Sequence, residues 1–299
     1  MVCKECIETM LEPILKNDNR MDRKFVKKFS GTKDQSFIDA VLRLLEDTEK
    51  TPDDNCMNGT REGEIDYLKN HLQSCLHNLN LIRKGLSMLP NKTAESAKLL
   101  DIGASPLTFI YSFCLNQKIF TIDLTDIFAE RCKKFGILHK QCDLLHGDLP
   151  FGDGTFDICI FTEVMEHLPM GYDHVFGQIK GVLKPEGLLV FSVPNFARVE
   201  NRIKVVFGYP VLDPLYKVFQ GCSHGFGHVR TYTMGEVKDI VEHYGFKVIY
   251  SRSIDPLRYY HRPSTIFYKS ALLYREVIVS LLPNSRAINV VLCKNLSTH

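Results

Sequence analysis

From Lys98 onward, short runs of β-branched and aromatic residues alternate with stretches that carry apolar residues at helical spacing. The strand-like runs read KLLDI, KIFTID, FDICIFT, LLVFSV, FKVIYS and INVVLC, and helical patterns cover residues 106–116, 126–135, 171–183 and 234–244. Strands and helices that alternate in this way pack as a mostly parallel sheet with helices on both faces. The sequence therefore predicts an α/β fold whose ligands bind beyond the carboxyl ends of the strands.

The residues before this alternation read as helices joined by polar loops. DQSFIDAVLRLLED and DYLKNHLQSCLHNLNLIRKGLSML repeat apolar residues at helical spacing, and the turn-rich KTPDDNCMNGTREGE separates them. We expect a helical N-terminal region over residues 1–94 that covers the site, and a main domain over residues 95–299. A long insertion at about 194–232 holds several aromatic residues, which suits either a cover over an apolar acceptor or a small satellite core.

Composition argues against several classes of protein. The net charge is +2, with 37 basic and 35 acidic side chains, so no basic surface favours nucleic acid as a partner. No run approaches the roughly 18 apolar residues of a membrane span, and acidic residues interrupt the N-terminus where a signal peptide would be apolar. The ten cysteines lack the spacing of a disulfide framework or a zinc site, since Cys3 and Cys6 form a CxxC without a second pair. We expect a cytoplasmic protein with no transmembrane segment and no metal site.

The first strand-like run ends in Asp101, and a turn of small residues leads from Gly103 to Pro106 and the next helix. Small residues let a ligand approach the backbone, and the amides at a helix N-terminus favour an anionic group. The turn lacks the G-x-G-x-x-G pattern of dinucleotide-binding folds, which argues against a nicotinamide-dependent oxidoreductase. The second run ends in Asp123, whose carboxylate suits the two hydroxyls of a ribose or, alternatively, caps the following helix.

Four motifs, LLDIG, TIDL, LPFGDGTFDICIFTEVMEHL and VLKPEGLLVFSVPN, occur in this order between residues 98 and 246. Together they resemble the successive motifs of class I S-adenosylmethionine-dependent methyltransferases, and in particular the type 11 group typified by the ubiquinone and menaquinone biosynthesis methyltransferases. The resemblance implies a Rossmann-like seven-stranded sheet whose last strand, at residues 288–293, runs antiparallel. It also implies S-adenosylmethionine as the cofactor and S-adenosylhomocysteine as the product.

The resemblance implies that residues at the strand ends surround the cofactor. These residues are Asp101, Gly103, Ala104, Ser105, Asp123, Leu124, Asp143, Leu144, Thr162 and Glu163. Asp101, Gly103 and Ser105 would surround the methionine moiety, Asp123 would hold the ribose and Leu124 would lie beside the adenine. Asp143, which we prefer to Asp148, would meet the adenine amino group, and the last two would face the reacting end.

The first motif departs from the family, which commonly shows E/D-x-G-x-G-x-G. Here Ser105 and Leu107 stand where that pattern has its second and third glycines. Serine is small enough to preserve the turn. A non-catalytic module that keeps the fold for binding or scaffolding is the alternative that this departure leaves open.

Methyl transfer is a direct displacement, and a hydroxyl or amine acceptor needs a proton acceptor nearby. The candidates for catalysis are His228, His167 and Glu163. The alternatives are that His167 belongs to the opening of a helix, and that Thr233 caps the next helix while the nearby histidines are solvated or satisfy loop carbonyls. Cys222 and His224 lie close to His228 in sequence, but without a carboxylate or second cysteine beside them they do not make a metal site.

The polar segment around His228 also supplies candidates for contacts with the acceptor, namely His224, Arg230 and Tyr232. The chain lacks the [N/D]-P-P-[Y/F] motif of amino methylation on bases, since FTEV stands after the fourth strand-like run. We therefore expect transfer to oxygen or nitrogen of a small-molecule, sugar-linked or lipid-linked acceptor.

Overall fold

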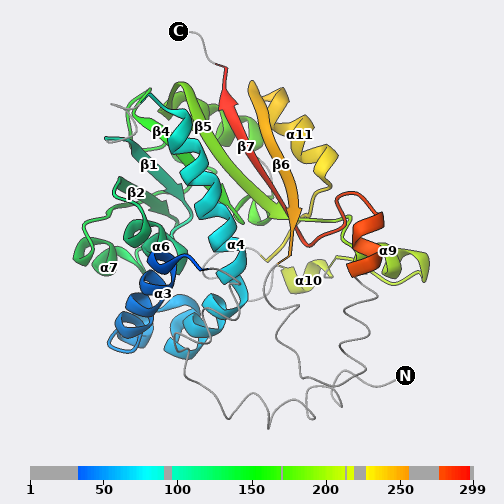
Figure 1. The fold of residues 1–299 in the computed structure, drawn as a ribbon, viewed down its shortest axis with the longest axis horizontal. Helices are drawn as coiled ribbons and strands as arrows, with labels where there is room; N and C mark the ends of the chain where they lie inside the picture. The colour runs from blue at the N-terminus through cyan, green and yellow to red at the C-terminus, as the bar shows by residue number, and fades with distance from the viewer. Residues whose placement is uncertain are drawn as a thin grey trace.

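The computed structural model describes residues 33–90, 96–169, 171–212, 214–218, 227–255 and 276–296. Within them, seven strands form one sheet in the order β3-β2-β1-β4-β5-β7-β6 (Figure 1). The strands are β1 Lys98–Ile102, β2 Lys118–Asp123, β3 Leu138–Gln141, β4 Phe156–Thr162, β5 Leu183–Pro194, β6 Phe246–Ile254 and β7 Ile288–Asn295. β7 pairs antiparallel with β5 and β6, whereas the pairs among β1 to β5 are parallel. The α/β fold and the antiparallel last strand are confirmed.

The helices predicted after Lys98 are present and are a little shorter than predicted. The described helices are α3 Gln35–Thr48, α4 Arg61–Met88, α6 Pro106–Cys114, α7 Ala129–Lys134, α8 Tyr172–Val182, α9 Val199–Val206, α10 Leu215–Val218 and α11 Met234–His243, with single turns η1 Asp53–Asn55, η2 Met57–Gly59 and η3 Met165–His167. Thr233 caps α11 and forms a capping box with Glu236, as one of the alternatives supposed. None of the helices in the described ranges is long and apolar enough to cross a bilayer.

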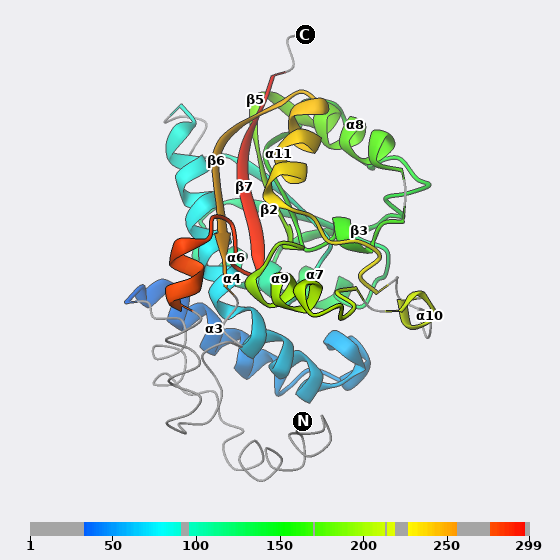
Figure 2. The same cartoon turned by 90° about the vertical axis from the view of Figure 1, so that its right-hand side faces the viewer.

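Helices cover both faces of the sheet, as Figure 2 shows with the sheet seen nearly edge-on. Successive residues of a strand point to opposite faces. In β4, Ile158 and Ile160 therefore pack toward α3, α4 and α6, while Cys159 and Phe161 pack toward α8 and α11. The N-terminal helices thus share one apolar core with the sheet.

The long helix α4 lies directly on the sheet at Gly85. A Cβ atom at this position would stand 3.1 Å from Leu188 Cδ1 and 3.3 Å from Ile158 Cδ1. The missing side chain lets the helix approach β4 and β5 closely. This contact fixes where the N-terminal half of α4 projects beyond the carboxyl ends of the strands.

Strand β3 is the strand that the sequence analysis did not identify. Its residues, LHKQ, are mostly exposed, and it pairs with β2 alone at the edge of the sheet. An edge strand without a buried face carries no apolar alternation, so periodicity cannot reveal it.

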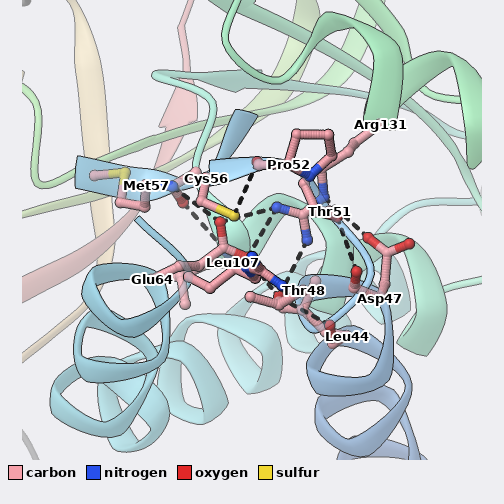
Figure 3. Close-up of polar contacts among 12 residues, drawn as sticks. Leu44, Asp47, Thr48, Thr51, Pro52, Cys56, Met57, Glu64, Leu107 and Arg131 are labelled. Carbon is pink, nitrogen blue, oxygen red and sulfur yellow. Dashed lines mark hydrogen bonds and ion pairs between the residues drawn. The ribbon is translucent and has the colours of Figure 1, made fainter. Parts of the chain in front are cut away.

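A buried ionic cluster joins α3, α4 and α7, as Figure 3 shows. The guanidinium of Arg131 donates to both oxygens of Glu64 at 2.8 Å and to Asp47 Oδ2 at 2.9 Å. Glu64 also accepts from the Thr48 hydroxyl at 2.6 Å and from the Met57 amide at 2.9 Å. Glu64 is fully buried, so the cluster determines how the loop between α3 and α4 lies against α7.

We expect the substitution Glu64→Gln to lower the free energy of unfolding by about 2–4 kcal/mol, because it breaks a buried charged pair and leaves donors unsatisfied. Glu62→Gln, on the exposed side of the same helical turn, is the matched control and should change stability by less than about 0.5 kcal/mol. Urea unfolding measures both. Equal unfolding free energies for the two variants would contradict a structural role for the cluster.

Candidate functional site

A cavity of about 920 Å³ lies beyond the carboxyl ends of β1, β2 and β4, under the N-terminal half of α4. Its volume falls in the range of ligand sites, and its place is where open α/β sheets bind ligands. All the strand-end residues that the resemblance assigned to the cofactor line this cavity: Asp101, Gly103, Ala104, Ser105, Asp123, Leu124, Asp143, Leu144, Thr162 and Glu163. The fold brings together residues from four separate segments.

The turn after β1 requires a glycine at position 103. Gly103 has a φ of +90°, and a Cβ atom there would lie 2.6 Å from Val164 Cγ2. Its amide donates to the carbonyl of Ile122 at 2.9 Å, which ties the turn to the end of β2. Ser105 then caps α6, since its hydroxyl accepts from the Leu107 amide at 3.2 Å. Ser105, which departs from the family pattern, therefore has a defined role in this turn.

Asp101 is a buried carboxyl group on the cavity wall. The hydroxyl of Thr108 donates to its Oδ2 at 2.6 Å. Burial raises the pKa of Asp101 to about 7, and the nearby Asp123 contributes in the same direction, while the Thr108 hydrogen bond opposes the shift. A positively charged ligand beside Asp101 would favour its ionised form.

Asp123 ends β2 and does not cap the next helix. Helix α7 begins at Ala129, whereas Asp123 Oδ1 accepts from the amide and the hydroxyl of Thr125 at 2.8 and 2.9 Å. Burial raises the pKa of Asp123, and the bonds from Thr125 lower it. The helix-capping alternative is wrong, and the carboxylate is oriented by its own loop.

The third acidic position is Asp143, after β3. Asp143 lines the cavity, and Asp148 is not among the residues that line it. The hydrogen bond from His146, at 2.9 Å, is the main cause that lowers the pKa of Asp143. Leu144, which is buried, and Leu124, which is exposed, also line the cavity. Both leucines present apolar surface at this end of the cavity.

The end of β4 is strained. Glu163 has a φ of 55°, a left-handed conformation that costs a non-glycine residue about 1–3 kcal/mol. Its amide donates to Ser192 O at 3.0 Å, and the Ser192 hydroxyl donates to its Oε1 at 2.7 Å. Two hydrogen bonds to β5 therefore fix the position of Glu163, which lines the cavity together with Thr162.

Next to this strand end, two histidines flank a buried carboxylate. The Nε2 atoms of His167 and His228 each lie 3.9 Å from Glu166 Oε1, and their rings are 4.9 Å apart. His167 lines the cavity, whereas His228 is not among the residues that line it. Burial raises the pKa of Glu166 well above its usual range, and the charge of Glu163 adds to this effect. Glu166 was not predicted as a site residue.

Two other predicted residues, Arg230 and Tyr232, lie outside the cavity lining. Arg230 pairs with Glu236 at 2.7 Å, and Tyr232 is buried with its hydroxyl 2.8 Å from that of Tyr172. Neither is among the residues that line the cavity. His224 lies outside the described residues. Their roles toward an acceptor stay predictions.

One face of α4 forms the opposite wall of the cavity, which the sequence analysis did not resolve into residues. Tyr67, His71, Ser74 and Asn78 point into it, and the rings of Tyr67 and His71 stack at 4.1 Å. These positions recur at four- and three-residue spacing, beside the apolar stripe that packs on the sheet. A polar stripe of this kind is the sequence signal that could have indicated a ligand-facing helix.

A family model described as a methyltransferase domain matches residues 75–251. This range is more than half of the chain and includes the cavity residues of all four strand-end segments. The chain belongs to this family. It is a class I methyltransferase, and the wider assignment made from the motifs is confirmed.

Several solved structures are similar to this methyltransferase. A SAM-dependent methyltransferase from Methanosarcina mazei is 14% identical, with a TM-score of 0.44 over 68% of this chain and 94% of its own. An S-adenosylmethionine-dependent methyltransferase from Mesorhizobium loti is 16% identical, with a TM-score of 0.46 over 71% and 96%. The Burkholderia thailandensis 1,6-didemethyltoxoflavin N1-methyltransferase is 15% identical, with a TM-score of 0.43 over 74% and 81%. No curated protein matches the chain.

In this methyltransferase we expect Gly103→Ala to lower the free energy of unfolding by at least about 2 kcal/mol, because a positive φ and a clash with Val164 combine. Gly136→Ala is the matched control, since Gly136 has a φ of +71° with no atom within 4 Å of the added Cβ. Urea unfolding of the two variants separates the cost of the positive φ, which both share, from the cost of the clash with Val164. If Gly103→Ala costs no more than Gly136→Ala, the close approach to Val164 does not constrain the turn.

A second prediction concerns pH. Burial raises the pKa of Asp101 in the folded chain to about 7, above the roughly 3.9 of an aspartate in water, so the native state holds its proton over a range in which the unfolded chain has lost it. The stability contributed by this proton is therefore present at low pH and lost as pH rises through about 7. The unfolding free energy of the wild type relative to Asp101→Asn should fall by about 2–3 kcal/mol between about pH 5 and pH 8. Asp153→Asn, at an exposed loop position, serves as control and should show no such trend.

Proposed function

We propose that this chain transfers a methyl group from S-adenosylmethionine to an oxygen or nitrogen atom of a small-molecule, sugar-linked or lipid-linked acceptor. The observation that carries the proposal is the charge of the cavity. Five carboxyl groups line it, from Asp54, Asp101, Asp123, Asp143 and Glu163, and the described lining includes no lysine or arginine. An acidic cavity favours a ligand with positive charge and disfavours the phosphates of a dinucleotide.

S-adenosylmethionine fits this set of residues. It carries a sulfonium and an ammonium group, which suit the buried carboxyl groups, and a ribose whose hydroxyls suit Asp123. Gly103 and Ala104 leave the backbone accessible beside the cofactor, and the positive end of the α6 dipole favours a carboxylate. When bound, the cofactor supplies an activated methyl group. The chain has to orient the acceptor and exclude water from the cavity.

The acceptor side is supported by α4 and by the insertion after β5. Tyr67, His71 and Asn78 would face an acceptor with hydrogen-bonding groups. In the insertion, α9 and the residues after it expose Val206, Phe207 and Tyr209 rather than forming a buried satellite core within the described residues. This apolar surface suits the lipid-linked class of acceptor. We also propose that the N-terminal helices act as a cover over the site.

The polar groups at the end of β4 would accept the proton that the acceptor releases. Glu163 and His167 line the cavity where the reacting atoms would meet, and His228 lies against His167. We propose these three residues as the catalytic group. We also propose that the protein acts in the cytoplasm and that it is a relative of the type 11 methyltransferases. A scaffold without catalysis, the second candidate, has little support, because Ser105 preserves the turn that the departure from the family motif put in question.

We expect Asp123→Ala to weaken binding of S-adenosylhomocysteine by about 30- to 1000-fold, because two charge-assisted hydrogen bonds of about 2–4 kcal/mol in total are lost. Isothermal titration calorimetry measures the dissociation constant. The control is Asp126→Ala in the same loop, whose carboxylate is exposed and pairs with His139 at 3.2 Å. An unchanged constant in a folded Asp123→Ala variant would remove the ribose assignment, and an absence of binding by the wild type would overturn the proposed cofactor.

A further inference from the structure

The cluster of Glu166, His167 and His228 has the composition of a metal site. One ligand atom from each residue lies within 4.8 Å of the other two, and both imidazole nitrogens are 3.9 Å from Glu166 Oε1. This distance is too long for a hydrogen bond. It suits two ligands of one ion, because metal bonds of about 2.0–2.2 Å allow two ligand atoms to be at most about 4.3 Å apart.

Glu166 is the unusual member. Its side chain is 1% exposed, and neither carboxylate oxygen has a hydrogen-bond partner among the described residues. A buried carboxylate that lacks a partner is costly, and proteins compensate it with hydrogen bonds, a cation or a metal ion. A second carboxylate, Glu163, stands three residues earlier in the chain and lines the same cavity as His167.

The backbone keeps the three residues together without any ion. Glu166 and His167 belong to η3, directly after β4. The amide of Val229 donates to the carbonyl of Glu166 at 2.7 Å, which holds the segment of His228 against η3. The same segment is joined to the end of β5 through the bridge between Asn195 and Tyr232. The ligand geometry is therefore preformed, and only a small contraction would close it around an ion.

We propose that Glu166, His167 and His228 bind a divalent transition-metal ion at the acceptor end of the cavity. Two imidazoles and one carboxylate suit zinc, manganese, iron or cobalt, and three protein ligands leave coordination positions open. The sequence predicted no metal site, because the chain neighbours of His228 include no carboxylate. The fold supplies that carboxylate from η3.

The site determines a class of acceptor, an inference that rests on the proposed function. His167 and Glu163 line the cavity, so the open positions of the ion face the place where the acceptor would lie. A divalent ion binds oxygen and lowers the pKa of a bound hydroxyl group, which makes it a better nucleophile at neutral pH. The acceptor is then an oxygen nucleophile, and a pair of adjacent hydroxyls would bind best. With both imidazoles on the ion, Glu163 is the carboxylate left to accept the proton.

The test uses the full chain after treatment with a chelator. Calorimetric titration with Zn²⁺ and with Mn²⁺ should show one site in the wild type, and Glu166→Gln should weaken it by at least about 100-fold. His228→Ala, at a half-exposed side chain, should weaken it similarly and serves if Glu166→Gln does not fold. The ion should also raise the melting temperature of the wild type but not of the variants. His243→Asn, at the end of α11, is the matched control and should bind the ion normally.

Three outcomes separate this proposal from the proposed function. Loss of ion binding in the Glu166 and His228 variants, with normal binding of S-adenosylhomocysteine, supports the site. Equal ion binding by wild type and variants, or none by the wild type, overturns it and leaves the cofactor proposal intact; Glu166 is then held as a neutral acid. Ion binding without any binding of S-adenosylhomocysteine overturns the proposed function and leaves the metal site.

Discussion

The structure depends on one constraint: the carboxyl ends of parallel strands meet at one edge of the sheet, and this chain places acids there. Asp101, Asp123 and Glu166 are held in surroundings that disfavour their charge, and each pKa is raised. The buried arginine of the described core, Arg131, is already bound to Asp47 and Glu64. The described lining of the cavity includes no arginine or lysine, so a cationic ligand would add the positive charge that its acids attract.

Much of the fold could be predicted, because strands buried on both faces and helices with one apolar face carry clear periodic signals. β1, β2 and β4 have the predicted bounds, and their ends gave the cavity residues. β3 was missed because a polar edge strand has no such signal. The wall formed by Tyr67 and His71 was not predicted, because the apolar stripe of α4 accounts for a helix by itself and the polar stripe beside it carries no separate periodic signal.

The cluster of Glu166, His167 and His228 could not be predicted from local sequence patterns. Glu166 stands in EVMEHL, a segment that reads as the opening of a helix, and nothing in the sequence shows that its side chain is buried. His228 reaches it only because a loop after β5 returns and pairs its backbone with η3. Such a pairing between distant segments is set by tertiary packing, which local patterns of residues do not encode.

Charge explains why one cavity can serve two ligands. An acidic wall at β1 and β2 suits the sulfonium and ammonium of the proposed cofactor, and an acid between two imidazoles at the end of β4 suits a metal ion. Glu163 follows β4 directly, lines the same cavity, and is held in a strained backbone conformation by two hydrogen bonds with Ser192. Strain retained at such a position indicates that the direction of this carboxylate matters. Under the proposed function, this carboxylate would accept the proton that an oxygen acceptor releases when it takes the methyl group.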